Sequence, residues 1–149
     1  MRECLPSDFE QLWQIDQSCF SAEIAYSREE LSYYLRLKTA ACLVACDAGQ
    51  VRGFILGHRY RRDSGHIITV DVAPAIQRSG LGSTLMQALE ERLRAAGCKT
   101  ILLEVAVDNR AALTFYKKHG YSVLKTLPRY YPGGLDGLLM GKTIKQQDC

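Results

Sequence analysis

The stretch that decides the fold is residues 66–107, which read HIITVDVAPAIQRSGLGSTLMQALEERLRAAGCKTILLEVAV. Residues 66–72 form a β-branched run, and residues 100–107 form a second one. Between them, residues 80–96 have the periodicity of a helix, which Gly97 closes. A strand, a helix and a strand in this order favour a right-handed crossover, so the two strands are predicted to be parallel.

Two helices and a hairpin are predicted before this unit. Residues 7–20 and 27–35 each begin with the Ser-x-x-Glu spacing of a capping box and continue with apolar residues at helical intervals. Residues 42–46 and 51–58 read as strands, and the turn at residues 47–50 joins them as an antiparallel hairpin.

One helix and a strand pair are predicted after the unit. Residues 109–119 have a helical pattern that stops at Gly120. Residues 121–124 and 138–144 then form the final pair of strands.

The composition fits one small domain. The chain has 149 residues and 47% hydrophobic content, which suffices for a substantial single core, so we expect one domain over residues 1–149. The formal charge of +3 is mild, and the Lys and Arg residues are scattered. These features give no reason to expect a nucleic-acid groove.

The six cysteines are expected to be reduced and structural. The start of the chain, MRECLPSD, has no apolar signal-peptide core, and no Cys or His spacing of a zinc site follows Cys42 and Cys46. No apolar run reaches the ~18 residues that a membrane span needs. We therefore expect a cytoplasmic protein without a metal site or a membrane span.

Residues 77–84, QRSGLGST, leave a strand and open a helix with two glycines at the junction. The first amides of a helix lack internal partners and lie at the positive end of its dipole, so they can hold an anion. A P-loop would need Lys after the second glycine, and a dinucleotide fingerprint would need glycine at position 85. By itself the pattern fits either a pyrophosphate site or a helix start that needed a tight turn.

The spacing of Gln77, Gly80 and Gly82 resembles the acetyl-CoA pyrophosphate motif of the GNAT superfamily of N-acetyltransferases, and VDVAP at residues 70–74 precedes it as in that family. Residues 103–121, LEVAVDNRAALTFYKKHGY, are similar to the second signature of the family. The resemblance implies an α/β GNAT (acyl-CoA N-acyltransferase) fold. Its mixed, mostly antiparallel sheet would carry a central parallel strand pair splayed around acetyl-CoA, with helices on both faces.

The resemblance also implies how acetyl-CoA would be held. The backbone of residues 70–72 would pair with the pantetheine arm, and an N–H near Val72 would polarise the reacting carbonyl. Asn109 would contact the cofactor, and Tyr116 would protonate the departing thiolate. The implied cofactor-binding residues are Val70, Asp71, Val72, Gln77, Arg78, Ser79, Gly80, Leu81, Gly82, Ser83, Asn109 and Tyr116.

For the base, the resemblance implies Glu104, at the position where related N-terminal acetyltransferases carry a Glu or His that acts through water. A carboxylate inside the apolar run ILLEV lies on a wet cleft or is raised in pKa by burial, although it can also pair with a neighbouring cation. His66 is a second candidate, and its alternative is a histidine that merely begins a strand. Tyr116 can equally be a core aromatic.

Arg129, Tyr130, Tyr131 and Pro132, followed by Asp136, resemble the substrate loop of ribosomal-protein-alanine and other protein N-terminal acetyltransferases. An α-amine of pKa ~7.8 is easier to deprotonate than lysine at ~10.4, by roughly 3.5 kcal/mol, which favours an α-amine as substrate.

A peptide N-terminus is thus the expected acceptor, with Tyr26, Tyr130 and Tyr131 as its walls, in a monomer or homodimer. The alternatives are acetylation of a small amine and a non-enzymatic acetyl-CoA sensor.

Overall fold

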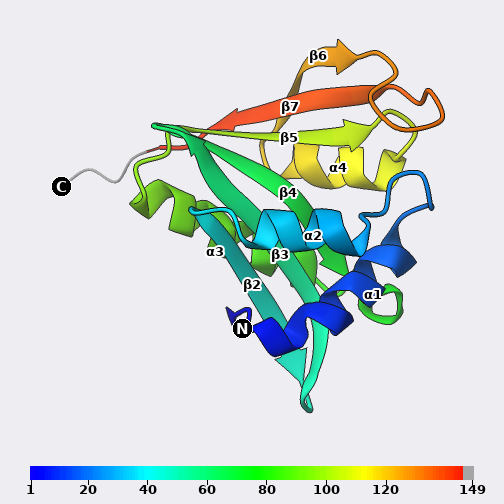
Figure 1. Cartoon of the computed structure of the whole chain (residues 1–149). Coiled ribbons are helices and arrows are strands. Elements are labelled where there is room, and N and C mark those ends of the chain that lie inside the picture. Colours follow the sequence, from blue (N-terminus) through cyan, green and yellow to red (C-terminus); the bar gives the residue numbers. More distant parts are fainter. Residues whose placement is uncertain (146–149) are drawn as a thin grey trace.

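The computed structural model describes residues 1–145, which fold into a seven-stranded sheet with helices on both faces (Figure 1). The strands lie in the order β1-β2-β3-β4-β5-β7-β6. Along the chain the elements are β1 (Arg2–Glu3), the short 3-10 helix η1 (Pro6–Asp8), α1 (Phe9–Cys19), α2 (Arg28–Leu35), β2 (Ala40–Asp47), β3 (Gln50–Arg61), β4 (Ser64–Val72), the 3-10 helix η2 (Pro74–Ile76), α3 (Leu81–Ala95), β5 (Thr100–Ala106), α4 (Arg110–Lys118), β6 (Ser122–Leu127) and β7 (Gly137–Thr143).

One strand pair of the sheet is parallel. β4 and β5 run in the same direction, with α3 as the crossover between them, and the other described pairs are antiparallel. The predicted strand, helix and strand unit is therefore confirmed. So is the predicted mixed sheet with a parallel pair at its centre.

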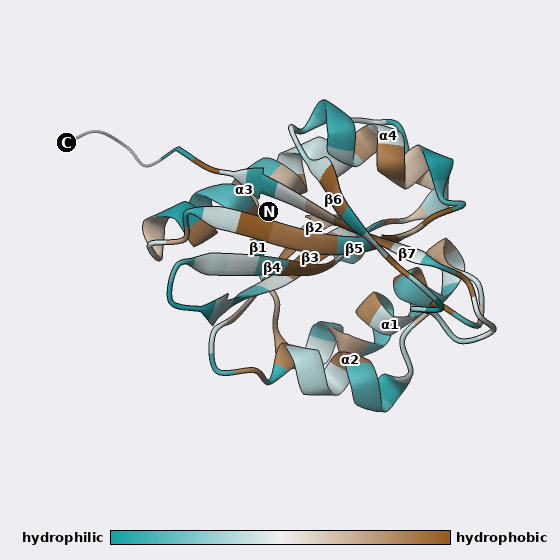
Figure 2. Ribbon diagram, turned by 90° about the horizontal axis from the view of Figure 1, so that it is seen from above, coloured by the Kyte–Doolittle hydropathy of each residue, from teal (hydrophilic) through white to brown (hydrophobic). Residues whose placement is uncertain are grey.

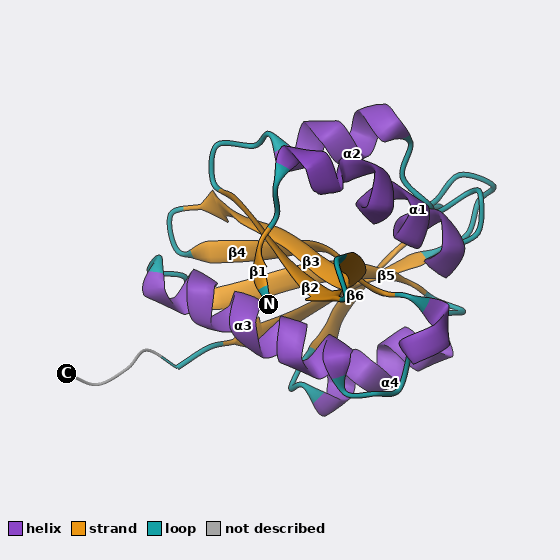
Figure 3. Ribbon diagram, turned by 90° about the horizontal axis from the view of Figure 1, so that it is seen from below, coloured by secondary structure: helices purple, strands orange, loops and turns teal. Residues whose placement is uncertain are grey.

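Two hydrophobic cores lie between the sheet and the helices, one on each face. α3 and α4 cover one face, while α1 and α2 cover the other (Figures 2 and 3). The first core joins Leu85, Met86 and Leu89 of α3 to strand residues such as Ile55 and Ile101. The second core lies under the two N-terminal helices and contains Leu12, Ile15, Leu31, Val44, Val51, Phe54 and Leu56. Apolar residues concentrate along the middle strands in Figure 2, where both faces of the sheet are covered.

The prediction that a capping box at Ser7 starts the first helix is wrong. Ser7 lies inside η1, and no side chain caps α1. The carboxylate of Asp8 instead accepts a hydrogen bond from the Leu5 amide at 2.7 Å and pairs with Arg2 at 2.7 Å. Ser7 and Asp8 are equally good capping residues by type, so the local sequence does not show which of them is used. The ion pair of Asp8 with Arg2 forms only in the folded chain.

The second capping box is confirmed. The Ser27 hydroxyl accepts from the Glu30 amide at 3.1 Å, and the Ser27 amide donates to the Glu30 carboxylate at 3.0 Å. The predicted hairpin is also present, with β2 and β3 longer than expected. Its two turn residues, Ala48 and Gly49, have φ values of 51° and 78°, as a tight hairpin turn requires.

Four of the cysteines, Cys4, Cys19, Cys42 and Cys46, are free thiols, and Cys149 lies outside the described residues. Within residues 1–145, no helix is both long and apolar enough to cross a membrane.

Two buried carboxyl groups face each other between α1 and β4. Asp16 is 0% exposed and Asp71 is 1% exposed. One oxygen of Asp16 accepts from the Tyr26 amide at 2.8 Å, and one oxygen of Asp71 accepts from the Thr69 hydroxyl at 2.5 Å. The remaining oxygen of each carboxyl has no donor among the described residues, so one proton shared between them satisfies both.

We expect Asp71→Asn to stabilise the protein at pH 8 by on the order of 1 kcal/mol relative to the wild type, and less so as the pH falls toward 4. Burial, and next the neighbouring Asp16, raise the pKa of Asp71 in the folded state. The unfolded chain therefore ionises first as the pH rises, and wild-type stability is lost between the unfolded and the folded pKa. Urea unfolding at several pH values measures this difference.

Asp8→Asn is the matched control, because Asp8 is also buried but Arg2 lowers the pKa of its carboxyl. This variant should be less stable than the wild type at pH 8, and the deficit should fade on acidification through the folded pKa. Equal pH slopes for the two variants would rule out the shared proton.

Candidate active site

The parallel pairing of β4 and β5 lasts only three residues, from Ser64 opposite Thr100 to His66 opposite Leu102. In the β3 register, Thr69 pairs with Leu56 and Ile67 pairs with Gly57, so Ile68 is an extra, bulged residue. Beyond the bulge, β4 pairs only with β3, while β5 continues against β7. A gap with an unpaired backbone edge therefore opens between the two central strands.

The bulge also reverses the alternation of side chains along β4, so that even-numbered residues after it lie on the side where odd-numbered residues lie before it. Ile67 packs in the core under α3, and after the extra residue it is Val70 and Val72 that pack there. The carboxyl of Asp71 consequently turns to α1, where it meets Asp16. Of the three predicted pantetheine-binding residues, Asp71 thus turns its side chain away from the gap and leaves only its backbone there.

Two side chains hold the end of the unpaired strand. The carbonyl of Val72 accepts hydrogen bonds from Gln77 Nε2 at 3.1 Å and from the Cys19 thiol at 3.3 Å. Gln77 thereby ties the glycine-rich loop to β4. Cys19 was not predicted as part of the site, and its contact across 53 residues leaves no local signal in the sequence.

The loop before α3 presents backbone amides to solvent. Arg78 and Gly80 have φ values of 68° and 88°, and Gly80 is the N-cap of α3 without a side-chain hydrogen bond. Leu81, Gly82 and Ser83 follow as the first turn, where helix amides lack intrahelical acceptors. The loop residues 77–80 are exposed, and the amides of the first turn lie at the positive end of the helix dipole, where an anion is favoured.

The glycine at position 82 lies in a tightly packed place. A Cβ there would lie 3.3 Å from the ring of Phe115 and 3.8 Å from Val72, so the helix start sits tightly against α4 and β4. The neighbouring Ser83 hydroxyl pairs with His119 Nε2 at 2.9 Å, again linking α3 to α4. The predicted cofactor loop and the second signature therefore lie against each other, and the contacting residues Ser83 and His119 are 36 residues apart in the chain.

Asn109 and Tyr116 lie at the start and in the interior of α4. The Asn109 side chain caps the helix by accepting from the Ala112 amide at 3.1 Å, which leaves its amide nitrogen for a ligand. Tyr116 is 8% exposed, and its hydroxyl makes no hydrogen bond with the described residues. Burial, and next the charge of Asp71, raise the pKa of this phenol, so it stays protonated at neutral pH.

Glu104 and His66 are brought together across the gap. His66 Nε2 lies 2.6 Å from Glu104 Oε2, and the two side chains are 24% and 22% exposed. Leu103 packs in the core with Tyr116, so by strand alternation Glu104 points to the opposite face of the sheet. A proton acceptor and a proton donor therefore lie on opposite sides of the gap.

The predicted tyrosines differ in how they are held. Tyr26 is fixed: its hydroxyl donates to the Ile68 carbonyl at 3.2 Å, at the bulge. Tyr130 is 48% exposed and stacks edge-on with Tyr131, at 4.9 Å between ring centres. The Arg129 amide donates to Asp136 at 2.9 Å, which fixes the loop that carries the pair.

Tyr34 of α2 is a further aromatic residue at this face, and sequence analysis missed it. Its ring lies 5.4 Å from that of Tyr26, and the charge of Glu104 contributes to raising the phenol pKa of Tyr34, Tyr130 and Tyr131. Burial is the larger cause in each case, and for Tyr130 the pKa rises to about 12. Protonated phenols thus surround Glu104, so they add no negative charge at neutral pH.

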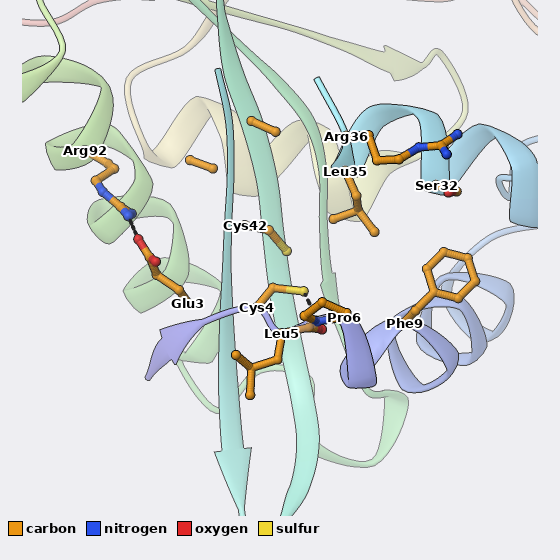
Figure 4. Close-up of a pocket in the computed structure, with 12 residues that line it drawn as sticks. Glu3, Cys4, Leu5, Pro6, Phe9, Ser32, Leu35, Arg36, Cys42 and Arg92 are labelled. Atoms are coloured by element: carbon orange, nitrogen blue, oxygen red, sulfur yellow. Dashed lines mark hydrogen bonds and ion pairs between the residues drawn. The ribbon is translucent and has the colours of Figure 1, made fainter. Parts of the chain in front are cut away.

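A separate pocket of about 480 Å³ lies at the outer edge of the sheet, away from the gap (Figure 4). Cys4 and Cys42 lie within it, beside Leu35 and Arg36 of α2. None of the predicted site residues lines this pocket.

Several known proteins are similar to this chain in sequence or in fold. A ribosomal protein bS18-alanine N-acetyltransferase of Salmonella typhimurium is 30% identical over 145 residues, which cover 93% of each chain. An uncharacterised N-acetyltransferase of Methanocaldococcus jannaschii is 41% identical over 95 residues, 63% of this chain, and the match spans only 60% of that relative. The crystal structure of Ard1 from Thermoplasma volcanium superposes with a TM-score of 0.89 at 31% identity, covering 97% of both chains.

Residues 9–121, which contain the gap, the glycine-rich loop and Tyr116, match the Acetyltransferase (GNAT) family, whose enzymes take the acetyl group from acetyl-CoA. Taken with the fold, this match shows that the chain belongs to the GNAT family of acetyltransferases.

Proposed function

We propose that this chain transfers the acetyl group of acetyl-CoA to the α-amino group of a protein or peptide N-terminus. The observation that carries the proposal is the gap between β4 and β5, with the Glu104–His66 pair on one face and the Tyr116 phenol on the other. An amine that approaches from the α2 side meets a base, and a sulfur on the α4 side meets an acid.

The described residues fit acetyl-CoA at two places. The unpaired edge of β4 at residues 70–72 offers backbone groups to an extended pantetheine arm, and the amides at the start of α3 offer donors to a pyrophosphate. The bound thioester supplies an activated acetyl group. The protein binds it in the gap, and a free N–H near Val72 orients its carbonyl.

Two proton movements are assigned to this chain. Glu104, through a water molecule, takes a proton from the incoming ammonium group, with His66 held 2.6 Å away to share the charge. Tyr116 gives its phenolic proton to the departing sulfur, in exchange for the second proton that the attacking nitrogen loses as the amide forms. The raised pKa of Tyr116 keeps that proton in place until the thiolate forms.

The acceptor is proposed to be a peptide end because the face around Glu104 is open and aromatic. Tyr34, Tyr130 and the fixed ring of Tyr26 form walls on two sides, and the loop with Tyr130 and Tyr131 is exposed. The full-length similarity to an enzyme named for alanine N-acetylation of a ribosomal protein supports the same class of acceptor.

We expect Tyr116→Phe and Glu104→Gln each to lower kcat roughly 10²- to 10⁴-fold, because each removes one proton-transfer group without removing its side-chain volume. Thiol release from acetyl-CoA measures the rate. Tyr33→Phe and Glu91→Gln, at exposed positions of α2 and α3, are the matched controls and should keep the wild-type rate. Full activity in either site variant would remove that residue from the mechanism.

The acceptor class is tested with three sets of substrates in the same assay. Short peptides with free N-termini should be acetylated, whereas blocked peptides that carry only lysine should react far more slowly, because the lysine ammonium holds its proton more tightly. Small polyamines complete the panel. If only the polyamines are acetylated, the proposed peptide acceptor is wrong and the substrate is a small amine.

We expect Ser79→Asp to weaken acetyl-CoA binding roughly tenfold relative to Ser79→Asn, a difference of ~1.4 kcal/mol. Ser79 is exposed beside the free amides of α3, so a carboxylate there repels a bound pyrophosphate. A carboxylate at a helix N-terminus also stabilises the helix, so unfolding does not explain the loss. Calorimetric titration with acetyl-CoA measures both affinities, and equal values would argue against a pyrophosphate at this loop.

A further inference from the structure

We propose that His58 completes a proton relay which runs from Glu104 through His66 to solvent. The proposal rests on the proposed function, because it assigns the exit of the proton that Glu104 takes from the substrate. His58 is on β3, directly opposite His66 of β4 in the strand register. Neither the sequence motifs nor the roles proposed above use it.

The three groups form a chain of hydrogen-bond contacts. His66 Nε2 lies 2.6 Å from Glu104 Oε2, and His66 Nδ1 lies 3.3 Å from His58 Nε2. Both ring nitrogens of His66 are therefore occupied, one on each side. The other nitrogen of His58 has no hydrogen-bond partner among the described residues, and His58 is half-buried, so this nitrogen is left for water.

The rings of His58, His66 and Tyr60 pack against one another. The two imidazoles stand 5.4 Å apart at 68° to each other. Tyr60 contacts both, with ring centres 6.2 Å from His58 and 6.0 Å from His66. This aromatic contact restricts the two rings to one side of the sheet, where they face Glu104.

The reaction needs such an exit because it releases one proton per turnover. An alkylammonium and a thioester give an amide, a thiol and one proton. The amine reaches Glu104 from the same open face, so a bound peptide shields the carboxylate from bulk water. A relay along the face of the sheet, from β5 across β4 to β3, then keeps a path to solvent that the substrate does not cover.

The relay starts with both histidines protonated at Nδ1, and only N–H and O–H bonds change in it. Protonated Glu104 donates to Nε2 of His66, and the N–H at Nδ1 of His66 passes its proton to Nε2 of His58. The proton at Nδ1 of His58 then leaves to water. Glu104 ends as a carboxylate, and a tautomer exchange in the two rings restores the starting state.

The surroundings keep His58 available as an acceptor. Burial, and next the charge of His66, lower the pKa of His58, while Glu104 opposes this shift. The other titratable side chains around the relay are phenols: Tyr60 from β3, Tyr34 from α2, and Tyr130 and Tyr131 from the loop before β7. Burial raises the phenol pKa of Tyr34, Tyr130 and Tyr131, so these three carry no charge at neutral pH that would hold the proton on the rings.

The test replaces His58 by Ala, which leaves space for added imidazole, and measures kcat for peptide acetylation in dilute buffer. We expect kcat to fall at least roughly tenfold, with KM for the peptide nearly unchanged, and to recover in a saturable way as imidazole is added. The alkaline pH dependence of kcat should also shift in the variant. His58→Gln should show the same loss without recovery.

Arg59→Gln is the control for disturbance of β3, because Arg59 is the next residue and its side chain bonds to the Ala96 carbonyl of the α3 segment. It should keep the wild-type response to imidazole. A wild-type kcat in His58→Ala, or a loss that imidazole leaves unchanged, would overturn the relay. Glu104→Gln and Tyr116→Phe in the same assay separate the two ideas: if they are inactive while His58→Ala is normal, only the relay fails.

Discussion

The early end of the β4–β5 pairing is the constraint on which the rest of the structure depends. Parallel strands in a sheet normally share a continuous ladder, whereas here three paired residues are followed by a bulge and a gap. The gap leaves backbone groups of β4 without a neighbour and joins the two faces of the sheet. A long ligand can pair with this edge, and groups on opposite faces can act on its reactive end.

A strand that lacks one neighbour needs other support, and α1 and the glycine-rich loop provide it. The Asp16–Asp71 contact joins β4 to α1. Gln77 and Cys19 donate hydrogen bonds to the carbonyl of Val72 at the end of the strand. Burying two carboxyl groups costs stability, and the proton that they share lowers this cost. The Asp16–Asp71 contact fixes β4 and leaves the gap open. A further β-strand paired with β4 would fill the gap.

The two faces of the gap give titratable groups opposite environments. Tyr116 is enclosed by apolar neighbours and keeps its proton, while Glu104 and His66 are partly hydrated and paired. The gap therefore has a buried phenol on one face and a solvent-accessible carboxylate on the other, which the proposed mechanism uses as its acid and its base. The proposed relay through His58 connects the face with Glu104 to solvent. It does not involve the face with Tyr116.

The sequence by itself determined the order of the elements, the parallel pair and the glycine-rich loop, because β-branched runs, helical periodicity and glycines act over a few residues. It also placed Glu104, Tyr116 and His66 as candidates through a family resemblance. Only the tertiary structure decided that His66 bonds to Glu104, that His58 lies behind it, and that Asp16 meets Asp71. His66 and Glu104 are 38 residues apart in the chain, the contact of His58 with His66 depends on the register of β3 and β4, and the side on which Asp71 lies depends on the bulge at Ile68. A pattern of period two cannot reveal where one extra residue shifts its phase, so the packing of neighbouring strands and helices had to settle it.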